Sequence, residues 1–209
     1  MKIKELRSPQ QPKGRWTLIF DDDTSMRLLP AVVADAGLFA GRELTEQELE
    51  SIKAAAGEAS AKERAVRIIS AADVSKADLK RRLTEKGETP EDAEAAVSWL
   101  TEMKLLDDSR VAAQIVSRGI SRGYGKNRIR QMLYEKNIPK DLWDEALAQV
   151  PEMDDAIDRF LQQKLKGTEP DRKELDRVIA ALVRRGHSWS DIQSALERYR
   201  DNLSETVSS

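Results

Sequence analysis

The sequence predicts a mainly α fold, in which a tandem array of three three-helix (helix-turn-helix-like) repeats follows a small N-terminal β-hairpin segment. The first observation is a period of about fifty residues, typical of helical repeat proteins, with turn positions at Gly87, Asn137 and Gly186. The second is composition, because charged residues make up 34% of the chain and aromatic residues only 5%, with 10 glycines and 7 prolines. This profile favours helices over a β-rich core.

Apolar residues stand at matching distances from each turn position, which indicates one helical unit used three times. The five aligned columns are Leu79/Ile129/Val178, Leu83/Leu133/Leu182, Ala93/Trp143/Ile192, Val97/Leu147/Leu196 and Leu100/Val150/Tyr199. Columns at helical spacing are typical of core packing. Because three short helices close only a small core, stacked repeats are expected to share interfaces and to form a curved array.

The N-terminal segment, residues 1–58, has a different pattern from the repeats. Arg15–Phe20 is β-prone, and an acidic turn separates it from a second apolar stretch, which predicts two or three short antiparallel strands joined by hairpins. A small sheet of this kind is marginal alone, so it must pack against a helix predicted at Pro30–Ala36 or against the first repeat. Thr45 and Glu48 form a capping-box pattern that opens a helix running towards Ala56.

The predicted repeats cover residues 59–104, 105–150 and 151–203, and residues 204–209 are expected to form a disordered tail. Their helices are expected at 61–71, 76–86, from 90 onwards, 108–122, 126–136, 139–149, 151–166, 171–185 and 189–200. Ser75 with Asp78 and Ser188 with Asp191 match the capping-box pattern, and Thr89 caps a helix that has Pro90 at its first position.

The sequence offers no recognisable catalytic or metal-binding set. There are no cysteines, which excludes disulfides, thiolate metal sites and cysteine nucleophiles, and the single histidine, His187, excludes a multi-histidine zinc site. The stretch 123–126 resembles a phosphate-binding loop but has Ile120 and Asn127 where that motif needs glycine and Ser/Thr. We therefore expect no enzyme activity, no catalytic residues, no cofactor and no metal.

The chain begins without an apolar leader, and its apolar stretches are too short to span a membrane. We expect a soluble, cytoplasmic monomer that has no membrane partner.

Charge is segregated within the second repeat. The formal net charge of the chain is −2, but between Arg118 and Lys140 only Glu135 is acidic. The basic residues of this segment are Arg118, Arg122, Lys126, Arg128, Arg130, Lys136 and Lys140. If Ile129 points into the core, helical geometry places Lys126, Asn127, Arg130 and Tyr134 on one outward arc.

The same positions are basic in the first repeat, at Lys76 and Lys80, and apolar in the third, at Leu175 and Ile179. The functional interpretation is a phosphate-contacting stripe over the first two repeats, with Gly123–Gly125 letting backbone approach a polyanion. Tyr134 would then stack on a base or pack on a neighbour. The alternative is a solvated helix face, which is common in chains this charged. The sequence leaves both interpretations open.

Residues 102–138, EMKLLDDSRVAAQIVSRGISRGYGKNRIRQMLYEKNI, resemble the bacterial regulatory protein family RecX. The resemblance consists of the Leu-Leu-Asp-Asp stretch at 105–108, an arginine-bearing helix through Arg118 and Arg122, a glycine-containing turn, and Lys136-Asn137-Ile138. Residues 74–87 resemble the first-repeat signature of the family, and the likeness covers about residues 59–199. Two departures are Asn137, where the family usually has glycine, and Val111, where an aromatic residue is common.

The resemblance implies a non-enzymatic modulator of the RecA recombinase in DNA repair, homologous recombination and the SOS response. Members of the family bind the groove of the RecA filament on DNA and inhibit its ATPase and strand-exchange activities. The implied partners are this filament and, weakly and non-specifically, single-stranded or double-stranded DNA. The predicted contact residues are Lys76, Lys80, Arg118, Arg122, Lys126, Arg128, Arg130 and Tyr134.

Two other functions are compatible with the same sequence. One is a helical module that binds DNA directly, as a transcription or nucleoid factor. The other is a protein-binding scaffold in which Leu175 and Ile179 belong to a docking face.

Overall fold

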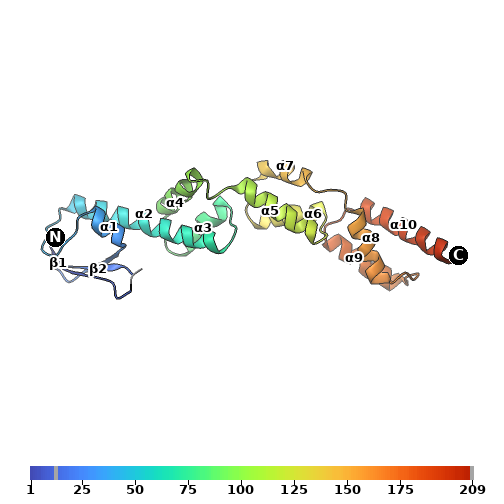
Figure 1. Cartoon of the computed structure of the whole chain (residues 1–209), viewed down its shortest axis with the longest axis horizontal. Coiled ribbons are helices and arrows are strands. Elements are labelled where there is room, and N and C mark those ends of the chain that lie inside the picture. Colours follow the sequence, from blue (N-terminus) through green and yellow to red (C-terminus); the bar gives the residue numbers. More distant parts are fainter. Residues whose placement is uncertain (12–13, 208–209) are drawn as a thin grey trace. The chain divides into compact units, whose positions relative to one another are not determined.

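The N-terminal segment forms a three-stranded antiparallel sheet, as the sequence predicted (Figure 1). The computed structural model describes residues 1–11 and 14–207, with side chains up to residue 204. The strands are β1 (Ile3–Arg7), β2 (Trp16–Phe20) and β3 (Ser25–Leu28), in the order β1-β2-β3.

The sheet buries one face against helices. Leu18 and Phe20 are buried because alternate residues of a strand point to the same side. They share a core with Val32 and Val33 of α1 (Pro30–Asp35) and with Ile52 of α2 (Glu46–Ala71). The marginal sheet is therefore stabilised by both helices, in agreement with the expectation that it needs a helical partner.

Helix α2 runs without interruption from Glu46 to Ala71 and begins at the predicted Thr45 capping box. The prediction of two separate helices in this region was wrong, and the predicted boundary between residues 58 and 59 lies inside α2. Gly57 lies in the middle of the helix, where the close approach of α4 (Pro90–Glu102) leaves no room for a Cβ atom. A Cβ atom at Gly57 would lie 2.5 Å from Oδ2 of Asp92, in the first turn of α4.

The first repeat packs the second half of α2 against α3 (Lys76–Glu85) and α4 (Pro90–Glu102). Ser75 and Thr89 cap these two helices with their side chains, as predicted. The carboxylate of Asp78, however, bonds Arg81 and Arg82. Gly87 follows α3 with a positive φ of 89°, a conformation that glycine adopts without strain.

The second repeat consists of α5 (Asp108–Ser121), α6 (Lys126–Glu135) and α7 (Trp143–Ala148) around its own core. Asn137 follows α6 with φ of 52°, so it replaces glycine in the left-handed turn. The helix predicted at 139–149 is shorter than expected. Pro139 has an extended conformation and Lys140–Leu142 form a 3₁₀ turn before α7 begins.

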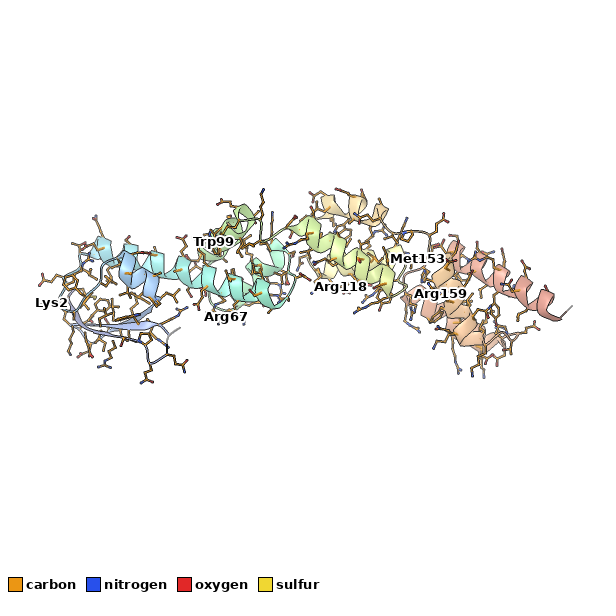
Figure 2. All side chains as sticks on the ribbon, in the orientation of Figure 1. Lys2, Arg67, Trp99, Arg118, Met153 and Arg159 are labelled. Carbon is orange, nitrogen blue, oxygen red and sulfur yellow. The ribbon has the colours of Figure 1, made fainter. Side chains whose placement is uncertain are left out.

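The third repeat packs α8 (Asp154–Leu165), α9 (Arg172–Arg184) and α10 (Trp189–Val207) around a third core. Helix α8 begins after Met153 and carries Arg159, both labelled in Figure 2, so it starts later than predicted. Helix α10 continues to Val207 and includes residues 204–207 of the predicted disordered tail. Residues 208–209 of that tail lie outside the described residues.

The chain divides into two compact halves, Met1–Leu106 and Asp107–Ser209, so the second and third repeats belong to the same half. The mainly α architecture with three three-helix repeats behind a small sheet confirms the predicted fold class. Within the described residues, no helix has the length and apolar character needed to cross a bilayer.

Candidate polyanion-binding surface

Helix α6 presents the predicted arc to solvent. Ile129 and Leu133 are fully buried in the second core, which turns Lys126, Arg130 and Tyr134 outward. Tyr134 is 68% exposed, an unusual position for a large aromatic side chain. Helical periodicity therefore predicted the orientation of this face correctly. We call Lys126, Arg130 and Tyr134 the α6 arc.

The two cations of the α6 arc have no carboxylate within 4.0 Å among the described residues. Nη1 of Arg130 donates to Oδ1 of Asn127 over 3.0 Å, a contact between neighbouring turns of the same helix. Lys126 and Arg130 line a hollow of about 600 Å³ together with Arg198 and three acidic residues. These are Glu152, Asp154 and Asp191. The α6 arc is thus cationic, but the hollow beside it is lined by as many acidic as basic side chains.

Arg128 lies on a different side of α6 from the arc. It contributes to a second hollow of about 380 Å³ at the junction of the second and third repeats, which we call the junction hollow. Its lining residues are Tyr124, Arg128, Phe160, Lys164, Ala181, Arg184 and Arg185. Four of these seven side chains are cationic and none is acidic. The structure therefore splits the predicted basic cluster between two sites of different charge balance.

Phe160 organises two cations of the junction hollow. The guanidinium of Arg185 lies 4.7 Å from the centroid of the Phe160 ring, and Nζ of Lys164 lies 5.8 Å from it. Nη1 of Arg185 also donates to the carbonyl oxygen of Arg122 over 3.2 Å. Cations near an aromatic face are favourable by about 0.5–2 kcal/mol, so the ring holds part of the site in place.

Sequence reasoning missed Lys164, Arg184 and Arg185. One signal was available, because the residue before each turn position is basic in all three repeats, at Lys86, Lys136 and Arg185. Nothing in that column shows, however, that Arg185 and Arg128 meet at one hollow. Their proximity depends on how the third repeat docks on the second.

The third repeat packs directly against the glycine-containing turn of the second repeat, residues 123–125. The amide of Gly125 donates to the carbonyl oxygen of Arg185 over 2.9 Å, and the amide of Asn127 donates to that of Gly186 over 3.2 Å. A Cβ atom at Gly125 would lie 2.3 Å from the Gly186 oxygen. The expectation that Gly125 offers its backbone to a polyanion was therefore wrong, because these amides already have partners.

The remaining predicted residues lie in varied surroundings. Arg118, labelled in Figure 2, and Arg122 are exposed around the end of α5. In the first repeat, Nζ of Lys80 lies 2.5 Å from Oε2 of Glu94, and Lys76 is half-buried with an interaction of its own. The basic residues of the first two repeats are therefore equivalent in sequence position, but those of the first repeat already have interaction partners.

Leu175 and Ile179 of the third repeat are half-buried and pack against the third core. Their apolar character is explained by this packing. They occupy the positions equivalent to the basic residues of the first two repeats, and their part in a docking face stays a prediction.

His187 adjoins the glycine turn and is buried. Its Nε2 lies 3.1 Å from the carbonyl oxygen of Gly123, which can only accept, so Nε2 carries the proton. Nδ1 has no hydrogen-bond partner among the described residues. Burial lowers the pKa of His187 below its ordinary 6.5, outweighing the hydrogen bond to Gly123 and the nearby Asp191, which raise it. Arg185 adds to the lowering.

We expect the His187 imidazole to titrate below pH 6.5, which NMR can follow directly because the chain has one histidine. As pH falls below 6.5, His187 binds a proton in the unfolded chain while the buried ring of the folded protein stays neutral. The contribution of His187 to the free energy of unfolding is therefore fully present above pH 6.5 and declines as pH falls to the pKa of the folded state. A midpoint at or above 6.5 contradicts this assignment, and His187→Gln serves as the control without this titration.

The fold defines the class of protein, which is a helical-repeat protein built from three three-helix repeats. Residues 107–147 match the family model described as RecX, second three-helix domain. The chain is 33% identical over 139 residues to the regulatory protein RecX of Vibrio campbellii (strain ATCC BAA-1116), which covers 66% of this chain and 90% of that protein. It is 25% identical over 203 residues to the regulatory protein RecX of Clostridium tetani (strain Massachusetts / E88), with 94% of each chain covered.

Solved structures show the same fold. The crystal structure of a regulatory protein RecX superposes with a TM-score of 0.68 at 24% identity, covering 94% of this chain and 98% of that one. The crystal structure of RecX from Lactobacillus salivarius has a TM-score of 0.63 at 14% identity over 70% of this chain. The chain belongs to the RecX family of regulatory proteins, which confirms the resemblance found in the sequence.

No group of three or more His, Asp or Glu side chains in the described part of the chain is placed to hold a metal ion. The similarity to the regulatory protein RecX of other bacteria supports a regulatory role.

Proposed function

We propose that this protein regulates the RecA recombinase by binding the RecA–DNA filament and reducing its ATPase and strand-exchange activities. Family membership supports the regulatory role. The observation that carries the proposal is the α6 arc, whose Lys126 and Arg130 have no described carboxylate partner and whose Tyr134 is 68% exposed. The proposed contact residues are Lys76, Lys80, Arg118, Arg122, Lys126, Arg128, Arg130 and Tyr134.

The net charge of the chain favours a partner made of protein and DNA, such as the RecA–DNA filament, over DNA alone. Phosphate contacts by Lys and Arg release counterions and provide most of non-specific binding. With a net charge of −2, the protein as a whole gains little from long-range attraction to DNA, so a local cationic face must act together with protein contacts. The exposed Lys80–Glu94 pair contributes at most about 1 kcal/mol, so Lys80 can exchange Glu94 for a phosphate.

We expect the double reversal Lys126→Glu and Arg130→Glu to raise the protein concentration needed for half-maximal inhibition of filament ATP hydrolysis by about tenfold or more. The physical reason is that attraction to a polyanion becomes repulsion, which costs several kcal/mol for closely apposed charges. The measurement is ATP hydrolysis by RecA filaments on single-stranded DNA at fixed salt. Arg172→Glu with Lys173→Glu is the matched control, because it changes the same charge on exposed residues of α9.

The same assays on the wild-type protein test the proposal itself. If the wild-type protein does not change ATP hydrolysis and does not sediment with the filament at any concentration, regulation of RecA through the filament is refuted. Tight binding to duplex DNA without RecA, with a steep salt dependence, would instead identify a direct DNA-binding module.

A further inference from the structure

The third repeat contains a hollow that is larger and more apolar than the two described above. It has a volume of about 820 Å³ and is lined by the turn between α8 and α9 and by the second half of α10. Its apolar side chains are Pro170, Leu175, Leu196, Tyr199 and Leu203. Leu175 and Leu203 are only half-buried, so part of their apolar surface faces solvent. We call this site the end hollow.

The repeat pattern explains where the end hollow lies. Three residues of the second repeat line the hollow of about 600 Å³ at which the third repeat adjoins it: Lys126, Val150 and Pro151. Their equivalents, at the same offset as Asn137 and Gly186, all line the end hollow: Leu175, Tyr199 and Arg200. All lining residues of the end hollow belong to the third repeat. The face by which the second repeat adjoins the next repeat is therefore left open on the third repeat, within the described residues.

The open face of the third repeat is apolar, although terminal repeats of an array usually present a polar outer face that keeps them soluble. The basic residues Lys126 and Arg130 of the second repeat are replaced by Leu175 and Ile179. Helix α10 also continues past Arg200, so that it brings Leu203 to the end hollow. A contiguous apolar surface of this kind is typical of a site of association.

We propose that two copies of this chain pair through their end hollows about a two-fold axis. A two-fold interface uses the same surface of both protomers, so this surface must be complementary to itself. The end hollow meets the requirement, because its lining contains one cation, Arg200, and one anion, Glu169, beside the leucines. Neither has an ion-pair partner among the described residues. A partner of uniform charge would be repelled by one of the two, whereas a second copy matches both.

Helix α10 provides the seam of the proposed dimer. Leu196, Arg200 and Leu203 follow each other at helical spacing and line the same hollow. About a two-fold axis, α10 of one protomer runs antiparallel to α10 of its partner, so that Leu203 of each copy enters the hollow of the other. Arg200 then faces the partner's Glu169 at both ends of the seam. This pairing replaces the monomer expected from the sequence.

Sedimentation equilibrium of the full-length protein over a range of concentrations tests the proposal. We expect the mass to rise from the 23.5 kDa of one chain to twice that value, with a dissociation constant of about 1–100 μM. The affinity is modest because the end hollow is small, and interfaces of about 1,600 Å² already range from micromolar to picomolar. A mass that stays at 23.5 kDa up to about 1 mM overturns the proposal.

Charge reversal identifies the interface. Arg200→Glu places two carboxylates opposite each other and Glu169→Arg places two cations opposite each other, so each variant alone should dimerise about tenfold more weakly or worse. An equal mixture of the two variants should dimerise as well as the wild type, because both pairs in a mixed dimer are of opposite charge. Both residues are exposed, so the variants should fold, and circular dichroism checks their helix content. Arg177→Glu is the matched control on α9, outside the end hollow, and should keep the wild-type dissociation constant.

Dimers that persist in both single variants overturn the proposal, because the copies then pair elsewhere. So does a mixture that stays monomeric at concentrations where the wild type is dimeric. A monomeric wild type that binds the apolar dye anilinonaphthalene sulfonate, with the binding lost on Leu203→Asp, assigns the end hollow to another apolar partner and also overturns dimerisation. RecA is absent from every assay and no proposed filament contact lines the end hollow, so failure here leaves the proposed regulation intact.

Discussion

Gly186→Ala is expected to lower the free energy of unfolding by about 3 kcal/mol, because the substitution combines backbone strain with overpacking. Gly186 has φ of 84°, where residues with a Cβ atom are strained. The added Cβ would also lie 2.1 Å from the backbone nitrogen of Arg128, an atom that cannot rotate away. The third repeat would therefore have to withdraw from the start of α6.

Gly87→Ala is the matched control, since Gly87 occupies the same position in the first repeat. Its φ of 89° is nearly the same, but no atom lies within 4 Å of a Cβ placed there. Only backbone strain remains, and the expected loss is about 1 kcal/mol. Urea unfolding of the two variants measures the difference, and equal losses would contradict a close-packed junction.

Hydrogen exchange locates the damage. The amides of Gly125 and Asn127 donate to the carbonyl oxygens of Arg185 and Gly186. Gly186→Ala should remove their protection, whereas Gly87→Ala should leave it as in the wild type.

Ile129→Ala has the second large expected effect, a loss of about 2–5 kcal/mol of unfolding free energy. Ile129 is fully buried in the second core. Its side chain lies against Gly119 of α5, where a Cβ would come within 2.5 Å of Ile129 Cγ1. Because α5 and α6 are already this close, the helices have little freedom to move inward and fill the cavity.

Tyr134→Ala on the same helix is the control for the Ile129 substitution. Tyr134 is 68% exposed, and surface substitutions usually change stability by no more than about 0.5 kcal/mol. Urea unfolding should therefore separate the two variants clearly. Comparable losses would mean that α6 is rotated relative to its core, and the α6 arc would then not face solvent.

The sequence predicted features that depend on neighbouring residues. The caps at Thr45, Ser75 and Thr89 and the turn at Asn137 were predicted correctly, because each depends on a few adjacent residues. The outward orientation of the α6 arc was equally accessible, since one buried residue and the helical period determine it. The same reasoning failed for α2, which continues without interruption through Gly57 to Ala71.

The junction hollow was outside the reach of sequence reasoning for a different reason. Arg128 and Arg185 are far apart in the chain, and no local pattern shows that they line one hollow. Nor does composition show which cations have partners. Lys80 and Arg130 are both basic and occupy equivalent positions in the first two repeats. Lys80 forms an ion pair with Glu94, whereas Arg130 has no carboxylate partner among the described residues.

The sequence by itself determined the number of repeats, the buried face of their helices and the lack of a cysteine or multi-histidine site. These properties follow from composition and from periodicities shorter than one helix–turn–helix. Only the tertiary structure decided that the glycine turn of the second repeat receives the third repeat and that one group of cations is left without carboxylates. Both depend on contacts between residues distant in sequence, where steric fit and charge pairing are properties of the docked surfaces.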